Sequence, residues 1–264
     1  MNSRERIGAI IAGETADRCG FWLGNPHADT WPILHQYFGT TTQEELRSKL
    51  HDDVRWIWTN DSYRHPDGKP MFDMQRQGEE LGAAGVFGNC EDAQDVEDFD
   101  WPNPDYLDFS NVLNRLRNAG EVYRAGGFWS PFFHETADFF GMENYFIKMY
   151  THPDVVHAVT THIVDFYLEA NARFFEAAGD LVDGFFFGND FGSQLDLLVS
   201  PDAFKEFIFP YFKKLTTPSS VMSSTAFWTL SCISFFSRSA CFLDAKMVAV
   251  MIVPTPRLIT IRRT

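Results

Sequence analysis

The stretch Gly184-Phe185-Phe186-Phe187-Gly188-Asn189-Asp190-Phe191-Gly192-Ser193-Gln194 decides the fold. With the preceding Val182 and Asp183, its three phenylalanines indicate a strand buried on both faces, which is typical of parallel sheets. Glycines and polar side chains follow, and glycines let a backbone approach a ligand or take positive φ. The pattern predicts a parallel strand that ends in a polar loop.

Amphipathic helices flank this strand. The first begins at Pro153, since proline suits the first helical position, and ends at Gly179. Its apolar side chains recur every three or four residues: Val155, Val156, Val159, Ile163, Phe166, Tyr167, Ala170, Phe174 and Phe175. The second begins after a Ser200 cap, and we expect a kink at Pro210 because proline lacks an N–H. Alternating strands and helices predict a parallel α/β fold.

Shorter elements continue this alternation toward the amino terminus. Composition predicts strands at residues 18–23, 54–58, 85–88 and 121–129, and helices at 30–38, 42–50 and 105–118. The chain has 264 residues, and a (β/α)8 TIM-type barrel needs about 250.

In such a barrel the active site lies at the carboxyl ends of the strands. This rule selects the loops at 24–27, 88–92, 128–131 and 188–194. Asp190 is the catalytic candidate, positioning or protonating a substrate; the alternative is that it only bonds N–H groups of its own turn. The candidate substrate-binding residues are Asn25, His27, Asn89, Phe128, Trp129, Asn189, Ser193 and Gln194. The histidine spacing gives no metal-ligand set, but His27 and His134 lie in or near these loops and are site candidates.

Composition bears on the partners and the location of the protein. The net charge is −14 and no basic run occurs, which argues against nucleic acid as a partner. No stretch of 18 apolar residues predicts a membrane span, and the first residues lack a secretory signal. The four cysteines form no CxxC motif, so a reducing, cytoplasmic location is expected.

The composition changes near Leu215. Residues 216–264 contain eight serines and one acid, Asp244, whereas the first 215 residues hold the other 35 acids. Apolar runs with few turn signals follow, including Val248–Val253. The sequence therefore predicts two parts: residues 1–215, a partial β/α barrel, and 216–264, an atypical tail. A shifted reading frame, a retained intron or a wrong gene model explains the tail, and the alternative is a genuine unusual segment.

Several motifs resemble those of a known family. The 184–194 stretch continues through Leu198-Val199-Ser200-Pro201, Phe204 and Phe207 to Pro210-Tyr211-Phe212-Lys213-Lys214-Leu215. Together these resemble the uroporphyrinogen decarboxylase superfamily, as do Gly126–Phe132 and Gly141-Met142-Glu143-Asn144. The resemblance covers roughly residues 5–215 and implies a (β/α)8 barrel that is incomplete at its carboxyl terminus.

The superfamily contains heme-pathway decarboxylases and corrinoid-dependent methyltransferases. The decarboxylases' early arginine pair is missing here, since this region has Cys19–His27, and a substrate with eight carboxylates needs cationic partners. The resemblance therefore implies a methyltransferase-like enzyme that moves a methyl group between a corrinoid and a small thiol or methylated substrate. Asp190 would be its polar anchor.

The same resemblance implies zinc and a corrinoid as cofactors of a full-length form, and a corrinoid protein as a partner. The family's zinc ligands, a His-x-Cys pair and a distant Cys, are absent after Leu215. The alternatives are a uroporphyrinogen decarboxylase acting on a tetrapyrrole, and a truncated, inactive product with unpaired strand edges.

Overall fold

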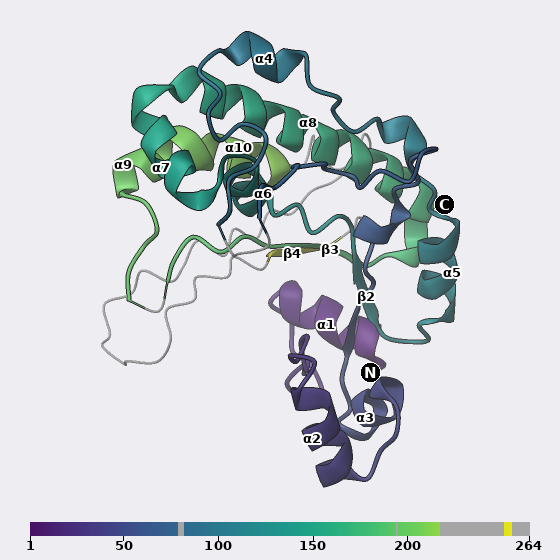
Figure 1. The fold of residues 1–264 in the computed structure, drawn as a ribbon. Coiled ribbons are helices and arrows are strands. Elements are labelled where there is room, and N and C mark those ends of the chain that lie inside the picture. The colour runs from purple at the N-terminus through teal and green to yellow at the C-terminus, as the bar shows by residue number, and fades with distance from the viewer. Residues whose placement is uncertain (79–81, 194, 217–250, 255–264) are drawn as a thin grey trace, which may run out of the picture.

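The structure, a computed structural model, describes residues 1–78, 82–193, 195–216 and 251–254. A small sheet lies between two groups of helices (Figure 1). Strands β1 (Val54–Trp56), β2 (Tyr123–Gly126) and β3 (Gly184–Phe187) run parallel and in this order. Strand β4 (Met251–Pro254) pairs antiparallel with β3, with Phe186 opposite Ile252. The described chain is thus a mixed α/β protein.

One face of the sheet is covered by a layer of helices. They are α6 (Phe132–Phe140), α7 (Met142–Thr151), α8 (Pro153–Ala178) and α10 (Phe209–Thr216). Phe185 and Phe187 of β3 point into this layer, where Phe185 contacts Phe175 and Phe187 contacts Phe212. Since alternate residues of a strand face opposite sides, Phe186 lies on the other face. All four residues of β3 are buried, as the parallel strand predicts.

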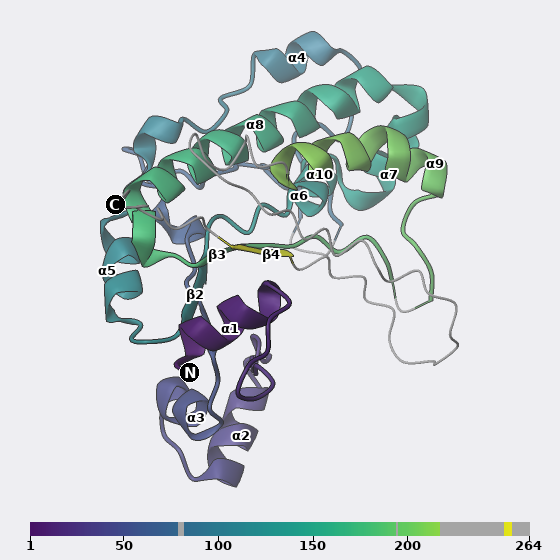
Figure 2. The ribbon, with the colours of Figure 1, turned by 180° about the vertical axis from the view of Figure 1, so that it is seen from behind.

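Helix α1 (Ser3–Ile11) covers the second face, where Ile7 and Ile11 pack against Val54, Tyr123, Ala125 and Phe186. Helices α2 (Thr30–Phe38) and α3 (Gln43–Lys49) lie beyond it, as both views show (Figures 1 and 2). Two capping boxes fix helix starts here, Asn2 with Glu5 for α1 and Thr42 with Glu45 for α3. The amino-terminal segment is therefore well specified locally.

The remaining helical turns are short. They are η1 (Asn60–Ser62), α4 (Ala93–Glu97), η2 (Pro104–Tyr106), α5 (Ser110–Asn118), η3 (Gly179–Leu181), α9 (Pro201–Ala203) and the π-helix η4 (Phe204–Ile208). Ser200 caps α9 through a bond from the N–H of Ala203, as predicted. The π-helix ends just before Pro210, where we expected a kink. A wider turn accommodates a residue that has no N–H to donate.

Most predicted elements are confirmed, with shorter ends. The 30–38 helix is α2, and the helix from Pro153 ends just before Gly179. Two predicted strands are wrong. Residues 18–23 form no strand because the Asp52 and Asp53 carboxylates accept the N–H groups of Leu23 and Phe21.

Residues 85–88 form a turn docked on the end of α6, where Phe87 donates its N–H to the Phe139 carbonyl. A Cβ on Gly85 would lie 2.3 Å from the Asp138 carbonyl oxygen, so only glycine fits this contact. The predicted tail, apart from Thr216 and β4, lies outside the described residues.

Candidate functional site

The loops that leave β1, β2 and β3 meet at the carboxyl ends of the strands. Asn60, after β1, accepts a hydrogen bond from the Trp129 N–H at 3.0 Å. Asn189, after β3, accepts from the Phe133 N–H at 3.0 Å and donates to the Ser130 carbonyl at 3.1 Å. Side-chain amides therefore tie the 128–133 loop to both neighbouring loops.

A third asparagine holds this loop from the helical layer. Asn171 of α8 accepts from the Phe128 N–H at 2.8 Å and donates to Ser130 Oγ at 3.2 Å. Ser130 takes a positive φ of 51°, a conformation that costs energy outside glycine unless neighbours enforce it. Asn171 and Asn189 both bond Ser130, so the strained turn is held on two sides.

Tryptophans gather beside these loops. Trp56 packs edge-on against Trp58 and Trp129, with ring centroids 5.1 and 6.1 Å apart. Trp58 and Trp129 are 38% and 37% exposed, so the cluster has an accessible side. The buried Nε1 of Trp56 has no hydrogen-bond partner among the described residues, and the same holds for Trp22, which packs on Phe186. The cluster offers flat apolar surface and indole donors.

Asp190 follows Asn189, and its Oδ1 is buried without a hydrogen-bond partner in the described part of the chain. Its N–H donates to His134 Nε2 at 3.2 Å. Burial lowers the pKa of His134 below its ordinary value, although the nearby Asp190 and Asp138 charges oppose this. Since Nε2 accepts a bond, the neutral ring carries its proton on Nδ1. The Asp190 main chain thus contacts a neutral imidazole at the carboxyl end of β3, with the Asp190 carboxyl group close by.

The structure brings three of the predicted residues, Trp129, Asn189 and Asp190, to this edge. The side-chain amide of Asn189 makes hydrogen bonds to main-chain groups, and these bonds position the loop. The prediction that Phe128 binds substrate is wrong. Its side chain is fully buried in the helical layer and contacts Tyr167, so it does not line an accessible mouth.

The other predicted residues lie apart. Asn25 and His27 are exposed, and His27 Nδ1 lies 3.4 Å from an Asp29 carboxylate oxygen. Asn89 is exposed next to Gly88, which packs against Phe140 at the far end of α6. Ser193 accepts the N–H groups of Leu195 and Asp196 within its own turn. Gln194 lies outside the described residues.

Sequence reasoning missed Asn60 and Asn171, whereas it named His134 as a site candidate because this residue lies near the mouth loops. Asn60 lies two residues after the apolar 54–58 run, so the strand-end rule that selected Asn189 would have found it. His134 lies three residues beyond the selected 128–131 loop, inside a helix that composition did not predict. No sequence signal marked Asn171, because it lies within the long helix.

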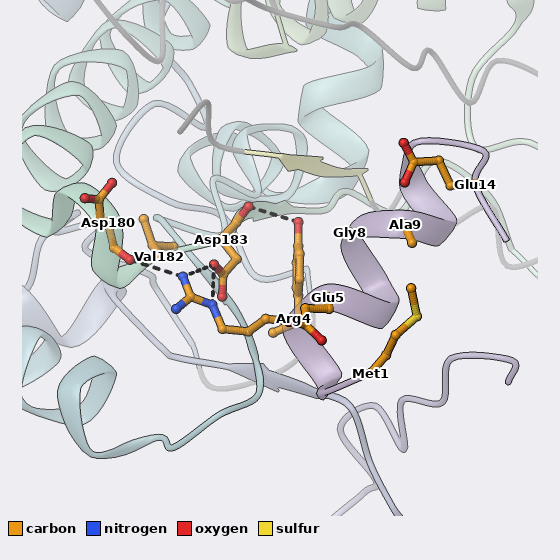
Figure 3. A pocket seen from close by; sticks show the side chains of 10 residues that line it. Met1, Arg4, Glu5, Gly8, Ala9, Glu14, Asp180, Val182 and Asp183 are labelled. Carbon is orange, nitrogen blue, oxygen red and sulfur yellow. Dashed lines mark hydrogen bonds and ion pairs between the residues drawn. The ribbon is translucent and has the colours of Figure 1, made fainter. Parts of the chain in front are cut away.

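A separate cavity lies at the amino ends of β2 and β3 (Figure 3). Its volume is about 460 Å³. Arg4 of α1 reaches across it to Asp183, with Nε 2.9 Å from Oδ1, and to the Asp180 carbonyl. Tyr123 donates its hydroxyl to the Asp183 carbonyl at 2.9 Å. These bonds join α1 to the sheet, and in barrels this end serves stability rather than chemistry.

Among the described residues, no group of three His, Cys, Asp or Glu side chains lies close enough to hold a metal ion. Cys90 is half-buried, and burial raises the pKa of its thiol, which disfavours a thiolate. The described residues therefore do not fit a zinc site, and we derive no step through zinc.

None of the described helices is both long and apolar enough to cross a membrane. No protein-family model matches the chain, and no curated protein matches it significantly.

Proposed function

We propose that residues 1–215 are the front part of a (β/α)8 barrel of the uroporphyrinogen decarboxylase superfamily, from its methyltransferase-like branch. The parallel order β1-β2-β3 and the helices between them agree with this proposal. The motifs from Gly184 to Leu215 supply the family resemblance. In its full-length form the enzyme moves a methyl group between a corrinoid and a small thiol or methylated substrate.

One observation carries the placement of the site. Asp190 Oδ1 is buried and unpaired among the described residues, beside His134 and one residue from Asn189. A buried carboxylate oxygen is costly to leave unsatisfied, so its retention at a strand end favours a functional role. In this role Asp190 anchors a polar group of the substrate, while Trp58 and Trp129 contact its apolar part.

A corrinoid would supply the methyl cation equivalent that the reaction transfers. The described residues do not show where such a large group would lie, and a barrel holds it at the carboxyl-end loops. The Trp56, Trp58 and Trp129 surface suits a flat apolar ligand there.

The test follows methyl transfer from methylcobalamin to 2-mercaptoethanesulfonate by the visible spectrum of the corrinoid, with the longest form of the protein that the gene encodes. Asp190→Ala is expected to lower the rate by at least about 100-fold while leaving the unfolding midpoint nearly unchanged. Asp202→Ala, in the short helix α9, is the matched control. Wild-type turnover by Asp190→Ala would remove Asp190 from the site.

The second candidate is a uroporphyrinogen decarboxylase, which needs no cofactor. The motifs that both branches share favour the decarboxylase, whereas the missing arginine pair argues against it. Release of carbon dioxide from uroporphyrinogen, with no methyl transfer, would establish this alternative. A protein inactive in both assays would support the third candidate, a truncated product without catalytic function.

A further inference from the structure

Glu135 places a carboxyl group in the apolar layer between α6 and α8. Its Oε1 accepts the Tyr167 hydroxyl at 2.5 Å. Its Oε2 is buried, with no hydrogen-bond partner among the described residues. Tyr167 has no exposed surface, and its ring contacts Phe72 and Phe128. In these apolar surroundings, a single hydrogen-bond donor offsets only a small part of the desolvation cost of an ionised carboxylate.

Among the described residues, the charged groups around Glu135 do not supply a counter-ion. Asp138, one turn further along α6, has the same sign as a Glu135 carboxylate and pairs with Arg76. His134 faces Asp190, and the group that α8 presents is Tyr167. Burial, with a smaller effect of Asp138, raises the pKa of Glu135 to about 8, although the Tyr167 bond opposes the shift. Glu135 is therefore protonated at neutral pH.

Helix α6 links this carboxyl group to the candidate site. Glu135 holds α6 against α8, while the preceding residue, His134, accepts the N–H of Asp190 from the loop after β3. A charge forced into the layer between α6 and α8 favours separation of the two helices, because separation admits water to the carboxylate. Any such shift of α6 also moves His134 relative to Asp190.

We propose that Glu135 and Tyr167 form a pH-sensitive latch between α6 and α8, which ionisation of Glu135 loosens in mildly alkaline solution. The closed latch keeps the His134–Asp190 contact in place. This role goes beyond the proposed function and is tested without any substrate.

The sign of the pH dependence follows from the direction of the shift. A glutamate in an unfolded chain titrates near pH 4.3. The folded chain keeps its Glu135 proton to higher pH, so the stabilising contribution is fully present below about pH 4.3. It is lost as the pH rises toward the folded-state pKa of about 8 and then stays constant.

The experiment compares urea unfolding of the whole chain with that of Glu135→Gln between about pH 5 and pH 9. The unfolding constant of the wild type, divided by that of Glu135→Gln, is expected to rise about tenfold per pH unit up to about pH 7.5 and to level off above pH 8. Glu176→Gln, at an exposed position of α8, is the matched control and is expected to follow the wild type. A constant ratio across this range would overturn the latch.

A second measurement follows the Asp190 amide by NMR, and its comparison of the wild type with Tyr167→Phe stands even if Glu135→Gln does not fold. In the wild type this resonance is expected to titrate with a midpoint near pH 8 and to stay fixed in Glu135→Gln. Tyr167→Phe removes the bond that favours the carboxylate, so its midpoint is expected to move upward. An Asp190 amide insensitive to pH, an unmoved midpoint in Tyr167→Phe, or α6 and α8 amides unprotected from exchange at every pH would each refute the proposal.

Discussion

Asp53, directly before β1, is a fully buried carboxylate shared by two arginines. Arg6 and Arg18 both donate to it, with Nη1 atoms 2.7 Å from its oxygens. Burial opposes its ionisation, but the bonds from Arg18, the Phe21 N–H, Ser3 and Arg6 outweigh this and lower the pKa of Asp53. One residue thus joins α1, the 18–23 segment and the sheet.

Asp53→Asn is expected to lower the free energy of unfolding by about 2–3 kcal/mol at pH 7, because it removes the buried carboxylate that pairs with Arg6 and Arg18 and leaves the buried Arg6 with only the half-exposed Asp17. Because folding lowers the pKa of Asp53, its contribution to the free energy of unfolding is fully present above about pH 4. This contribution is lost as the pH falls through the folded-state pKa of Asp53. Urea unfolding at pH 7 and at acidic pH tests both statements. Asp17→Asn, on a carboxylate 41% exposed, is the control and should cost clearly less.

Gly188 shows a close approach at the candidate site. A Cβ there would lie 2.7 Å from Trp129 Nε1, so any side chain must displace the indole. Gly188→Ala is expected to cost about 1–3 kcal/mol of stability and to shift the tryptophan emission as Trp129 moves. Gly8→Ala is the control, since nothing lies within 4 Å of its Cβ and alanine favours the α1 helix. Equal stability of the two variants would contradict the crowding at Gly188.

Among the elements, the 128–133 loop depends most on single side chains. Asn189→Ala leaves the Phe133 N–H and the Ser130 carbonyl unpaired, which is expected to cost about 2–3 kcal/mol. Hydrogen exchange should rise at 128–133 and stay slow in the centre of α8. Asn114→Ala removes only an exposed bond from Arg117, so we expect a change within about 0.5 kcal/mol. Unchanged exchange at 128–133 would show that other contacts hold the loop.

Sequence periodicity predicted the elements whose buried side chains follow the regular spacing of a helix or a strand. Helix α8 shows its buried stripe over 26 residues, and β3 is apolar on both faces. The 18–23 segment was equally apolar, but distant carboxylates at Asp52 and Asp53 take its N–H groups. Likewise Asp190 followed from the strand-end rule, whereas Phe128 did not keep its predicted role. Whether the side chain of a loop residue is buried depends on tertiary packing, which sequence periodicity does not encode.

At the scale of the whole molecule, the strand order of the sheet bears on the change in composition near Leu215. Strand β3 has β2 on one side, parallel to it, and on the other side the antiparallel β4. In a (β/α)8 barrel the next neighbour of β3 would be a further parallel strand, reached through the helix that ends near Leu215. The composition change near Leu215 falls just where that strand is expected.

We therefore expect the transcript, sequenced across the Leu215 codon, to encode a further β/α unit in another reading frame. A strand ending in His-x-Cys, with a later cysteine, would supply the metal ligands that the described residues lack and would favour the methyltransferase. A continuation without these ligands would favour the decarboxylase. If the transcript confirms the present frame, a barrel of the proposed kind would keep open strand edges, and the chain should be poorly soluble or molten when expressed, because open edges expose the core. A sharp cooperative melt of a soluble monomer in that frame would instead contradict the proposed barrel and indicate a fold of a different kind.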